Sequence, residues 1–267
     1  MAQIECPDSI VVLGSGGARI VVARQARASG GLWFVLAGTQ LLVDPGPGAL
    51  VRVTESRHRL DPTRLDGILL SHRHLDHSGD VNAMVEAMTS GGTQPRGTLL
   101  APRDALEGDD PVVLKYVRDY LSELVTLEEG GRYRLGRVTI VCPLRHRHRG
   151  EVYGFRFEVE GLSVSYVADT AYFPELADAY RADVVLFNVV RYRPSNLDHL
   201  HAPEVEELVR KMRPKLSVLT HFGMTMLRAK PWVVAREMSR ATGCQVIAAA
   251  DGQKIDIGRY TREGERR

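Results

Sequence analysis

The sequence predicts a layered α/β fold, formed by one domain over residues 1–267. Short apolar runs of the length of buried strands alternate with segments whose apolar residues recur at helical spacing. A length of 267 residues, 44% of them hydrophobic, is ordinary for one α/β domain with a sizeable core. No internal repeat, linker or low-complexity segment divides the sequence.

The first strand is predicted from the apolar run over residues 10–14, which ends in the glycine-rich stretch Gly14-Ser15-Gly16-Gly17. Such a stretch can cradle a phosphate group when it opens a helix. Here the GxGxxG spacing is absent and no helical pattern follows. We therefore interpret the stretch as a turn between two strands.

Two further strands, over 32–36 and 40–43, are predicted to form a hairpin because Ala37-Gly38-Thr39 between them is a turn signal. Asp44 follows the second strand directly. An acidic residue at this point either caps the next helix, predicted over 49–56, or accepts hydrogen bonds inside the protein.

The apolar run over 67–70 predicts a buried strand that leads into the stretch Ser71 to Asp80, which reads SHRHLDHSGD. This stretch places four potential metal donors within six residues: His72, His74, Asp76 and His77. The alternative is a solvated polar loop, but this quartet arises by chance in roughly one chain in a thousand. The loop would supply half of a two-metal site. Ser78-Gly79-Asp80 predicts the turn and N-cap of a helix over 81–88.

The remaining elements are predicted from the same two periodicities. Apolar alternation on both sides of Glu160-Gly161 indicates a hairpin over 153–166. The segment 113–127 has apolar residues at helical spacing and is interpreted as a surface helix or lid, or as a plain connecting helix. The other strands are expected over 98–101, 138–141, 183–190, 216–220 and 245–249, and the strand over 245–249 is expected to be the last one of the core. Helices are expected over 203–212 and 232–240. The charged tail from Gly258 is expected to be frayed.

More candidate donors lie just past other predicted strands. His146 and His148 stand among three arginines in 145–149, where burial would be costly unless an anion or a metal uses them, the alternative being a solvated basic loop. Asp169 and His221 each follow an apolar strand. Strand ends form the site in layered α/β proteins, so we expect these residues to meet.

Composition argues against several classes of protein. No apolar run reaches about 18 residues, so no membrane span is expected. The N-terminal sequence MAQIECPDSI lacks the features of a signal peptide, which makes the cytoplasm the expected location. The cysteines, Cys6, Cys142 and Cys244, are scattered and expected to be reduced. A net charge of +2 argues against dedicated nucleic-acid binding.

The donors, in this order along nearly the whole chain from Asp44 in LLVDPG to the closing ADGQKI, resemble the motifs of the metallo-β-lactamase superfamily. The resemblance implies a four-layer αββα sandwich of two mixed sheets flanked by helices. Asp44 would orient the first-motif loop. The implied metal ligands are His72, His74 and His148 for one ion, Asp76, His77 and His221 for the second, and Asp169 for both.

The choice of His148 over His146 rests on the family pattern His-x4-Tyr/Phe-Gly-Tyr/Phe, which Tyr153-Gly154-Phe155 completes from His148. Within the superfamily, the chain is similar to tRNA 3′-processing endonucleases and to cyclic-phosphate diesterases of phosphonate breakdown. It lacks room for the tRNA-clamping arm of the first group, because His148 and Asp169 are only 21 residues apart. It also lacks the cysteine-bound zinc of the second.

His199, which lies 22 residues before His221, matches an extra histidine of the phosphodiesterase branch. The resemblance implies that His199 is a catalytic proton donor or phosphate contact, with His201 as the alternative. One of the two could instead cap the helix that begins near Pro203. A histidine is the usual proton donor near neutral pH.

The sequence therefore predicts a dinuclear metal-dependent hydrolase, a phosphodiesterase that acts on a small or nucleotide-like anionic substrate through a metal-bridging hydroxide. Asp76 would serve both as ligand and as part of the catalytic group. Histidine and carboxylate donors suit two divalent ions, zinc first, with manganese or iron as alternatives. Arg191 and Arg193 are candidate anion contacts, or plain surface charges.

Three other hypotheses stay open at this point. The same metal set could hydrolyse a thioester or a lactone, and that reaction would not need His199. β-Lactam hydrolysis is less favoured, because that branch often places a cysteine where Asp169 stands. The third hypothesis is a non-catalytic, metal-binding scaffold. Such a scaffold arises when this fold loses its metal ligands, and the complete donor set argues against that. A homodimer is compatible with every one of these functions.

Overall fold

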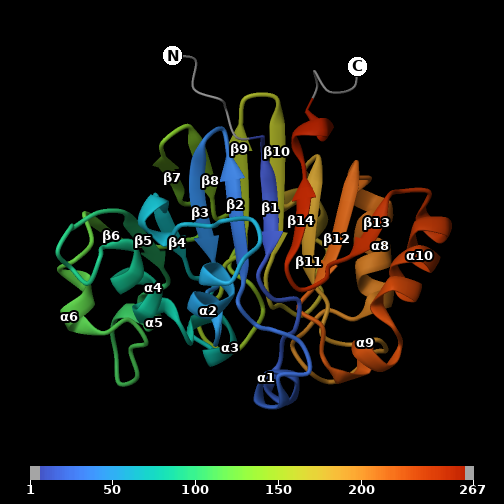
Figure 1. The fold of residues 1–267 in the computed structure, drawn as a ribbon. Coiled ribbons are helices and arrows are strands. Elements are labelled where there is room, and N and C mark those ends of the chain that lie inside the picture. Colours follow the sequence, from blue (N-terminus) through green and yellow to red (C-terminus); the bar gives the residue numbers. More distant parts are fainter. Residues whose placement is uncertain (1–6, 262–267) are drawn as a thin grey trace.

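The computed structural model describes residues 7–261, in which two mixed β-sheets pack face to face with helices on their outer faces (Figure 1). Each sheet has seven strands, in the orders β14-β1-β2-β3-β4-β5-β6 and β13-β12-β11-β10-β9-β8-β7. This architecture confirms the predicted four-layer αββα sandwich.

The first sheet combines antiparallel and parallel pairs. Its strands are β1 (Ser9–Val12), β2 (Leu32–Leu36), β3 (Thr39–Val43), β4 (Gly67–Leu69), β5 (Thr98–Ala101), β6 (Glu123–Thr126) and β14 (Gln253–Asp256). The run from β3 to β6 is parallel, whereas β14, β1, β2 and β3 pair antiparallel.

The second sheet has the same mixed character. Its strands are β7 (Arg132–Leu135), β8 (Val138–Val141), β9 (Phe155–Val159), β10 (Leu162–Val167), β11 (Val184–Asn188), β12 (Leu216–Thr220) and β13 (Val246–Ala248). The run from β10 to β13 is parallel, and β7 to β10 are antiparallel. The carboxyl ends of the central strands of both sheets therefore open onto one edge of the sandwich.

The helices cover the outer faces and connect the strands. They are α1 (Arg19–Arg24), α2 (Ala49–Thr54), α3 (Leu75–Ser78), α4 (Val81–Met88), α5 (Arg103–Leu106), α6 (Lys115–Arg118), α7 (Leu176–Ala179), α8 (Ala202–Met212), α9 (Met224–Arg228) and α10 (Pro231–Thr242), with 3-10 turns η1 (Pro62–Arg64) and η2 (Gly258–Tyr260). Among residues 7–261, none of the helices combines the length and the apolarity that crossing a bilayer needs.

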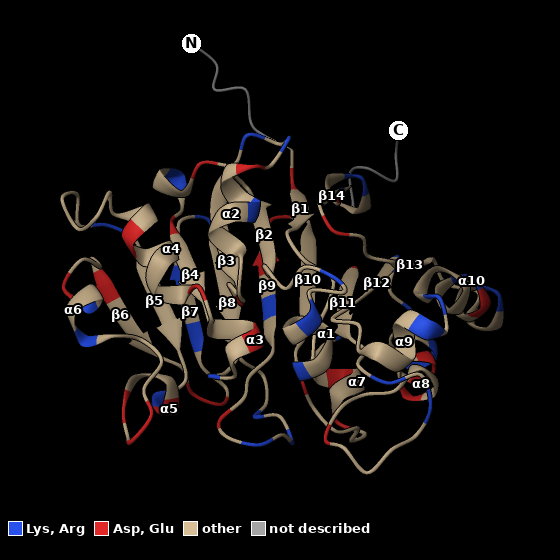
Figure 2. Ribbon diagram, turned by 60° about the horizontal axis from the view of Figure 1, so that its bottom comes forward, with Lys and Arg blue, Asp and Glu red and all other residues tan. Residues whose placement is uncertain are grey.

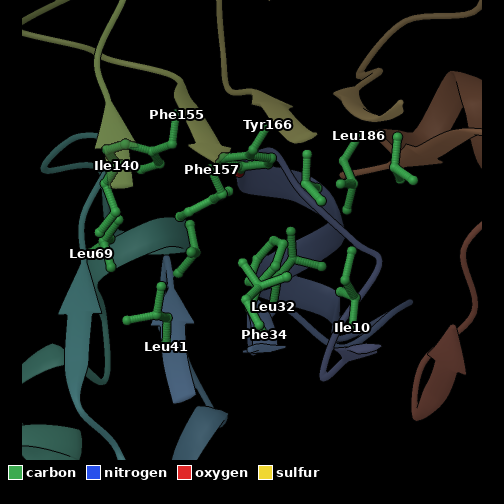
Figure 3. Packing of buried hydrophobic residues seen from close by; sticks show 14 of the residues in the cluster. Ile10, Leu32, Phe34, Leu41, Leu69, Ile140, Phe155, Phe157, Tyr166 and Leu186 are labelled. Atoms are coloured by element: carbon green, nitrogen blue, oxygen red, sulfur yellow. The ribbon is translucent and has the colours of Figure 1, made fainter. Parts of the chain in front are cut away.

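The main core lies between the two sheets. The rings of Phe34 on β2 and Phe157 on β9 meet there with centroids 4.9 Å apart, and both side chains are fully buried (Figure 3). Successive residues of a strand point to opposite faces, so Trp33 packs under the outer helices while Phe34 enters the main core. Strands buried on both faces explain why the sequence shows continuous apolar runs.

Three sequence predictions were wrong. The segment 113–127 does not form one helix: α6 spans only Lys115–Arg118, and β6 (Glu123–Thr126) pairs with β5 instead. The strand over 245–249 does not close the core, because β14 follows it and pairs with β1. A helix does follow the glycine-rich stretch, namely α1.

In the first case, the ladder hydrogen bonds to β5 outweigh the helical spacing of the apolar residues. In the second, Gln253–Asp256 alternates burial on a half-exposed edge strand, a weak sequence signal. α1 has only six residues, too few for a clear periodicity. Cys142 and Cys244 are free thiols; Cys6 and the tail beyond residue 261 lie outside the described residues.

Replacing Phe157 with alanine is expected to lower the free energy of unfolding by about 3–5 kcal/mol, because it opens a cavity between the sheets. Denaturant titration measures the loss. Val51→Ala on α2 is the control, because Val51 is 54% exposed, and its effect should stay within about 0.5 kcal/mol. Equal effects of the two substitutions would contradict the central place of Phe157 in the core.

Candidate metal centre

The candidate site lies at the strand-end edge of the sandwich, which Figure 2 brings forward with α1 and α3 next to each other. After β4 the chain turns into α3, a single helical turn whose Ser78 and His77 amides donate to the His74 carbonyl at 3.0 and 2.9 Å. This tight curl directs His72, His74, Asp76 and His77 from one short loop toward the second sheet.

The structure brings together all seven side chains that the sequence singled out as ligands. Their donor atoms form groups, and the atoms of each group lie within 4.8 Å of one another: His72, His74 and His148; Asp76, His77 and His221; and His72, His77 and Asp169. A fourth such group joins His148 and Asp169 to His199. In the first group, His74 Nδ1 lies 2.9 Å from His72 Nε2 and 3.3 Å from His148 Nε2. In the second, His221 Nε2 lies 3.4 Å from Asp76 Oδ2.

Asp169 lies between the two groups. One carboxylate oxygen, Oδ2, is 3.5 Å from His77 Nε2, and the other, Oδ1, is 3.4 Å from His221 Nδ1. Asn188 on β11 donates its side-chain amide to Oδ1 at 2.9 Å, which fixes the carboxylate. This position suits a ligand shared by two ions.

The structure places His148, not His146, in the cluster. His146 is buried, and its ring is already satisfied: Nδ1 donates to the Asp169 carbonyl (3.2 Å) and Nε2 contacts the Tyr180 hydroxyl (2.8 Å). Burial lowers the pKa of His146 to about 4, so its ring is neutral. His148 Nδ1 donates to the Asp198 carbonyl at 2.7 Å, which leaves Nε2 free beside His74.

His199 and His201 have different environments. His201 caps α8: its Nδ1 accepts from the Glu204 amide at 3.4 Å, and its Nε2 lies 3.2 Å from a Glu204 carboxylate oxygen. His199 faces the cluster, with Nδ1 3.4 Å from Asp169 Oδ2 and its ring centroid 4.7 Å from that of His148. Only His199 is therefore in reach of a molecule held at the cluster.

Asp44 is a buried acceptor rather than a helix cap. Its Oδ2 accepts from Ser71 Oγ (2.7 Å), the Tyr166 hydroxyl (2.8 Å) and His77 Nδ1 (2.9 Å), and its Oδ1 accepts from the Ser71 amide (2.7 Å). Because the Ser71 hydroxyl donates to Asp44, it accepts from His72 Nδ1 at 3.0 Å. In its neutral form each of these histidines, His72 and His77, therefore carries its proton on Nδ1 and presents an unprotonated Nε2 to the cluster.

The sequence did not reveal several groups that shape the site. The Ala18 amide donates to Asp76 Oδ2 at 3.0 Å. Gly17 lies so close to His221 that a Cβ there would stand 2.1 Å from Nδ1, so no larger residue fits. Asn188 also donates to the Tyr166 hydroxyl at 3.1 Å. The one available signal for Asn188 was a lone amide in the apolar run DVVLFNVV.

Burial and charge set the protonation states of the cluster. Burial lowers the pKa of His72, and it lowers that of His74 to about 4. Burial alone would raise the pKa of Asp169, but the neighbouring His221 and His77 outweigh it and hold this pKa well below its usual range. His77 has a raised pKa against its own burial, because Asp44, Asp76 and Asp169 surround it. The cluster therefore attracts positive charge.

The donor set fits divalent cations. Within residues 7–261, four buried histidine ring nitrogens have no hydrogen-bond partner, namely His77 Nε2, His199 Nδ1 and both nitrogens of His221. Buried polar atoms without a partner are rare and call for a ligand or a water molecule. Neutral imidazoles together with ionised carboxylates are the protonation states that binding of zinc or a similar metal requires.

Comparisons with known proteins agree with this geometry. Residues 39–222 match the family model described as a beta-lactamase superfamily domain. An uncharacterized protein of Methanocaldococcus jannaschii is 32% identical over 262 residues, which cover 94% of this chain and 96% of that protein.

Two solved structures share the fold at low identity. The metallo-beta-lactamase fold protein YhfI of Bacillus subtilis matches with a TM-score of 0.77 and 20% identity, covering 94% of this chain and 99% of that chain. A diphosphatase from the PhnP family matches with a TM-score of 0.68 and 21% identity, covering 94% and 97%.

Replacing Tyr166 with phenylalanine is expected to lower the free energy of unfolding by about 1–3 kcal/mol, because Asp44 and Asn188 lose a buried hydrogen-bond partner. Tyr116→Phe is the matched control: it removes an exposed hydroxyl that donates to Glu86 at 2.9 Å and should cost less than about 0.5 kcal/mol. Denaturant titration of both variants checks the difference. Equal stabilities would show that the Asp44 network does not hold this part of the fold.

Proposed function

Because the chain belongs to the beta-lactamase superfamily, we propose that it is a metal-dependent hydrolase that cleaves a small or nucleotide-like phosphodiester. The observation that carries the proposal is the meeting of seven donor side chains and His199 at one edge of the sandwich. Histidine and carboxylate ligands without any thiolate favour zinc, with manganese or iron as alternatives.

Two cations would fit these donor groups. His72, His74 and His148 would hold one, Asp76, His77 and His221 the other, and Asp169 would contact both. Ions bound there would supply a water activated near neutral pH and would neutralise charge on the phosphate oxygens. The surrounding chain keeps the ligands in place: Asp44 directs His77, Ser71 directs His72, and Asn188 directs Asp169.

His199 is the proposed proton donor. In diester hydrolysis, water adds to phosphorus, the bond to one ester oxygen breaks, and that oxygen needs a proton to leave as an alcohol. The His199 ring lies at the border of the cluster with 17% of its side chain exposed, so it can contact both the bound substrate and solvent. Burial lowers the pKa of His199, and an adjacent phosphate anion would favour its protonated form.

An anionic substrate is supported by charge around the site. The loop that carries His148 also carries Arg145, Arg147 and Arg149, all exposed. Arg191 is half-buried and lies on the same connection between β11 and α8 as His199, and its backbone pairs with that of His201 in an isolated bridge. Arg193 is exposed. These cations make phosphate esters better candidates than neutral carbon esters.

Metal content tests the first part of the proposal. Purified protein, stripped with chelator and reloaded with zinc, should hold about two ions per chain by elemental analysis. His148→Ala should lose one of them, whereas His58→Ala, which removes a histidine bonded to the Gly252 carbonyl at 3.1 Å, should lose none. A wild-type protein that takes up no metal would contradict the proposal.

A substrate panel tests the second part. Bis-para-nitrophenyl phosphate, cyclic nucleotides, thioesters and lactones are offered to the zinc-loaded protein. We expect cleavage of the phosphodiesters, and a decrease in kcat of about 10²–10⁴-fold in His199→Ala, the usual contribution of a general acid. The His58→Ala variant should keep wild-type rates. Cleavage of carbon esters alone, unaffected in His199→Ala, would instead support thioester or lactone hydrolysis.

A further inference from the structure

Three large apolar side chains stand exposed around the candidate metal centre. Leu75 at the start of α3 is 72% exposed, Ile20 on α1 57% and Leu197 on the loop before α8 53%. We call these three residues the apolar rim. Leaving a leucine or isoleucine in water forgoes the stabilisation of its burial, and grouped exposed apolar residues mark binding surfaces.

Leu75 is held at the centre by its neighbours in the sequence. His74 and Asp76 on either side of it both point into the cluster. The amides of His77 and Ser78 bond to the His74 carbonyl, which fixes the backbone here. With its neighbours turned inward, the Leu75 side chain is left to face solvent beside the donor atoms.

Ile20 and Leu197 reach the same place from other elements. Ile20 lies two residues after Ala18, whose amide donates to Asp76 Oδ2 at 3.0 Å. The carbonyl of Leu197 accepts from the His199 amide at 2.7 Å. The next residue, Asp198, accepts from His148 Nδ1 at 2.7 Å through its carbonyl. The rim thus approaches the cluster from three separate segments, and α1 and α3 are adjacent in Figures 1 and 2.

Apolar and cationic side chains therefore share the entrance to the site. Arg149 and Arg193 are exposed on the loops that also bear His148 and Leu197. A substrate that carried only a phosphate and sugar hydroxyls would gain nothing from three exposed aliphatic side chains. A molecule with an anionic group and an aliphatic or aromatic group would match both.

We infer that the substrate of this centre is amphiphilic, an anionic phosphate ester with an apolar organic substituent that packs on Ile20, Leu75 and Leu197. This inference rests on the proposed function, because it takes the metal centre to bind the phosphate group. It adds the chemical class of the substituent, which the metal ligands themselves do not determine.

The test measures binding rather than turnover. Methyl-, butyl- and hexylphosphonate are titrated by calorimetry into the zinc-loaded protein. A fully buried methylene is worth about fourfold in affinity, and partial burial on the rim should still make hexylphosphonate bind at least about tenfold more tightly than methylphosphonate. In the variant I20Q/L75Q/L197Q this ratio should fall to about twofold or less, because the polar side chains offer less apolar surface.

Leu124→Gln is the control, because Leu124 is also an exposed leucine, at 37%, but lies on β6 at the edge of the first sheet and not in the apolar rim. It should keep the wild-type ratio. Zinc content of every variant is measured, so that loss of metal is not mistaken for loss of the rim. Equal affinity of wild type for the three phosphonates, or an unchanged ratio in the triple variant, overturns the inference.

Size-exclusion chromatography distinguishes substrate binding at the rim from dimer formation. Comparison of binding with hydrolysis distinguishes failure of this inference from failure of the proposed function. If size-exclusion chromatography shows a wild-type dimer that the triple variant dissociates, the rim is an interface between copies and the inference fails. If affinity increases with chain length but no phosphodiester is hydrolysed, the inference stands and the phosphodiesterase proposal fails. If phosphodiesters are hydrolysed but affinity does not depend on chain length, the phosphodiesterase proposal stands and the inference fails.

Discussion

The buried carboxylate of Asp44 is the group on which the site depends. It accepts hydrogen bonds from Ser71 after β4, from His77 in α3 and from Tyr166 on β10, and so joins both sheets to the metal-binding loop. A carboxylate that is only 4% exposed is tolerated because donors surround it. Its backbone has φ 52°, an uncommon conformation for a residue with a side chain, and His221 has φ 57°. Both unusual conformations occur at the cluster, where the surrounding contacts hold them in place.

Asn188 on the second sheet extends the hydrogen-bond network of Asp44 to Asp169. Asn188 donates to both Tyr166 and Asp169, so an amide on β11 links the Asp44 network to the carboxylate between the two donor groups. An amide nitrogen can only donate. The Tyr166 hydroxyl must therefore accept from Asn188 and give its proton to Asp44. The carboxylate of Asp44, which can only accept, sets the direction of the hydrogen bonds from His77 and Ser71, and through them the tautomers of neutral His77 and His72.

The sequence predicted the site better than the elements around it. Polar residues just past apolar strands are a strong signal, because parallel strands end at one edge, and this pattern singled out the seven donors. His199 was predicted only from the resemblance to the phosphodiesterase branch of the superfamily. The family spacing between the ligand histidine and Tyr153-Gly154-Phe155 also favoured His148 over His146. In the structure, the ring of His146 lies between the Tyr180 hydroxyl and the Asp169 carbonyl.

The groups that the sequence did not reveal act through main-chain atoms or close approach. Nothing in the residue type of Ala18 shows that its amide bonds to Asp76, and the need for Gly17 appears only once His221 lies against it. Likewise β6 depends on β5 for its ladder, so its sequence alone, with helical spacing nearby, gave the wrong element. Long-range pairing decides such short segments.

The pairing of β14 with β1 affects the order of assembly. Ser9 to Val12 lie opposite Asp256 to Gln253, so β1 completes its pairing only when a segment very distant in the sequence has reached it. Until then, the nascent first sheet presents an open edge of unpaired amides and carbonyls to which another chain could attach. Pairing of β14 is thus a non-local step of folding, and it replaces the fully buried strand β1 at the edge of the sheet with a short strand whose Lys254 and Asp256 are exposed. Charged side chains on an edge strand oppose pairing with another chain.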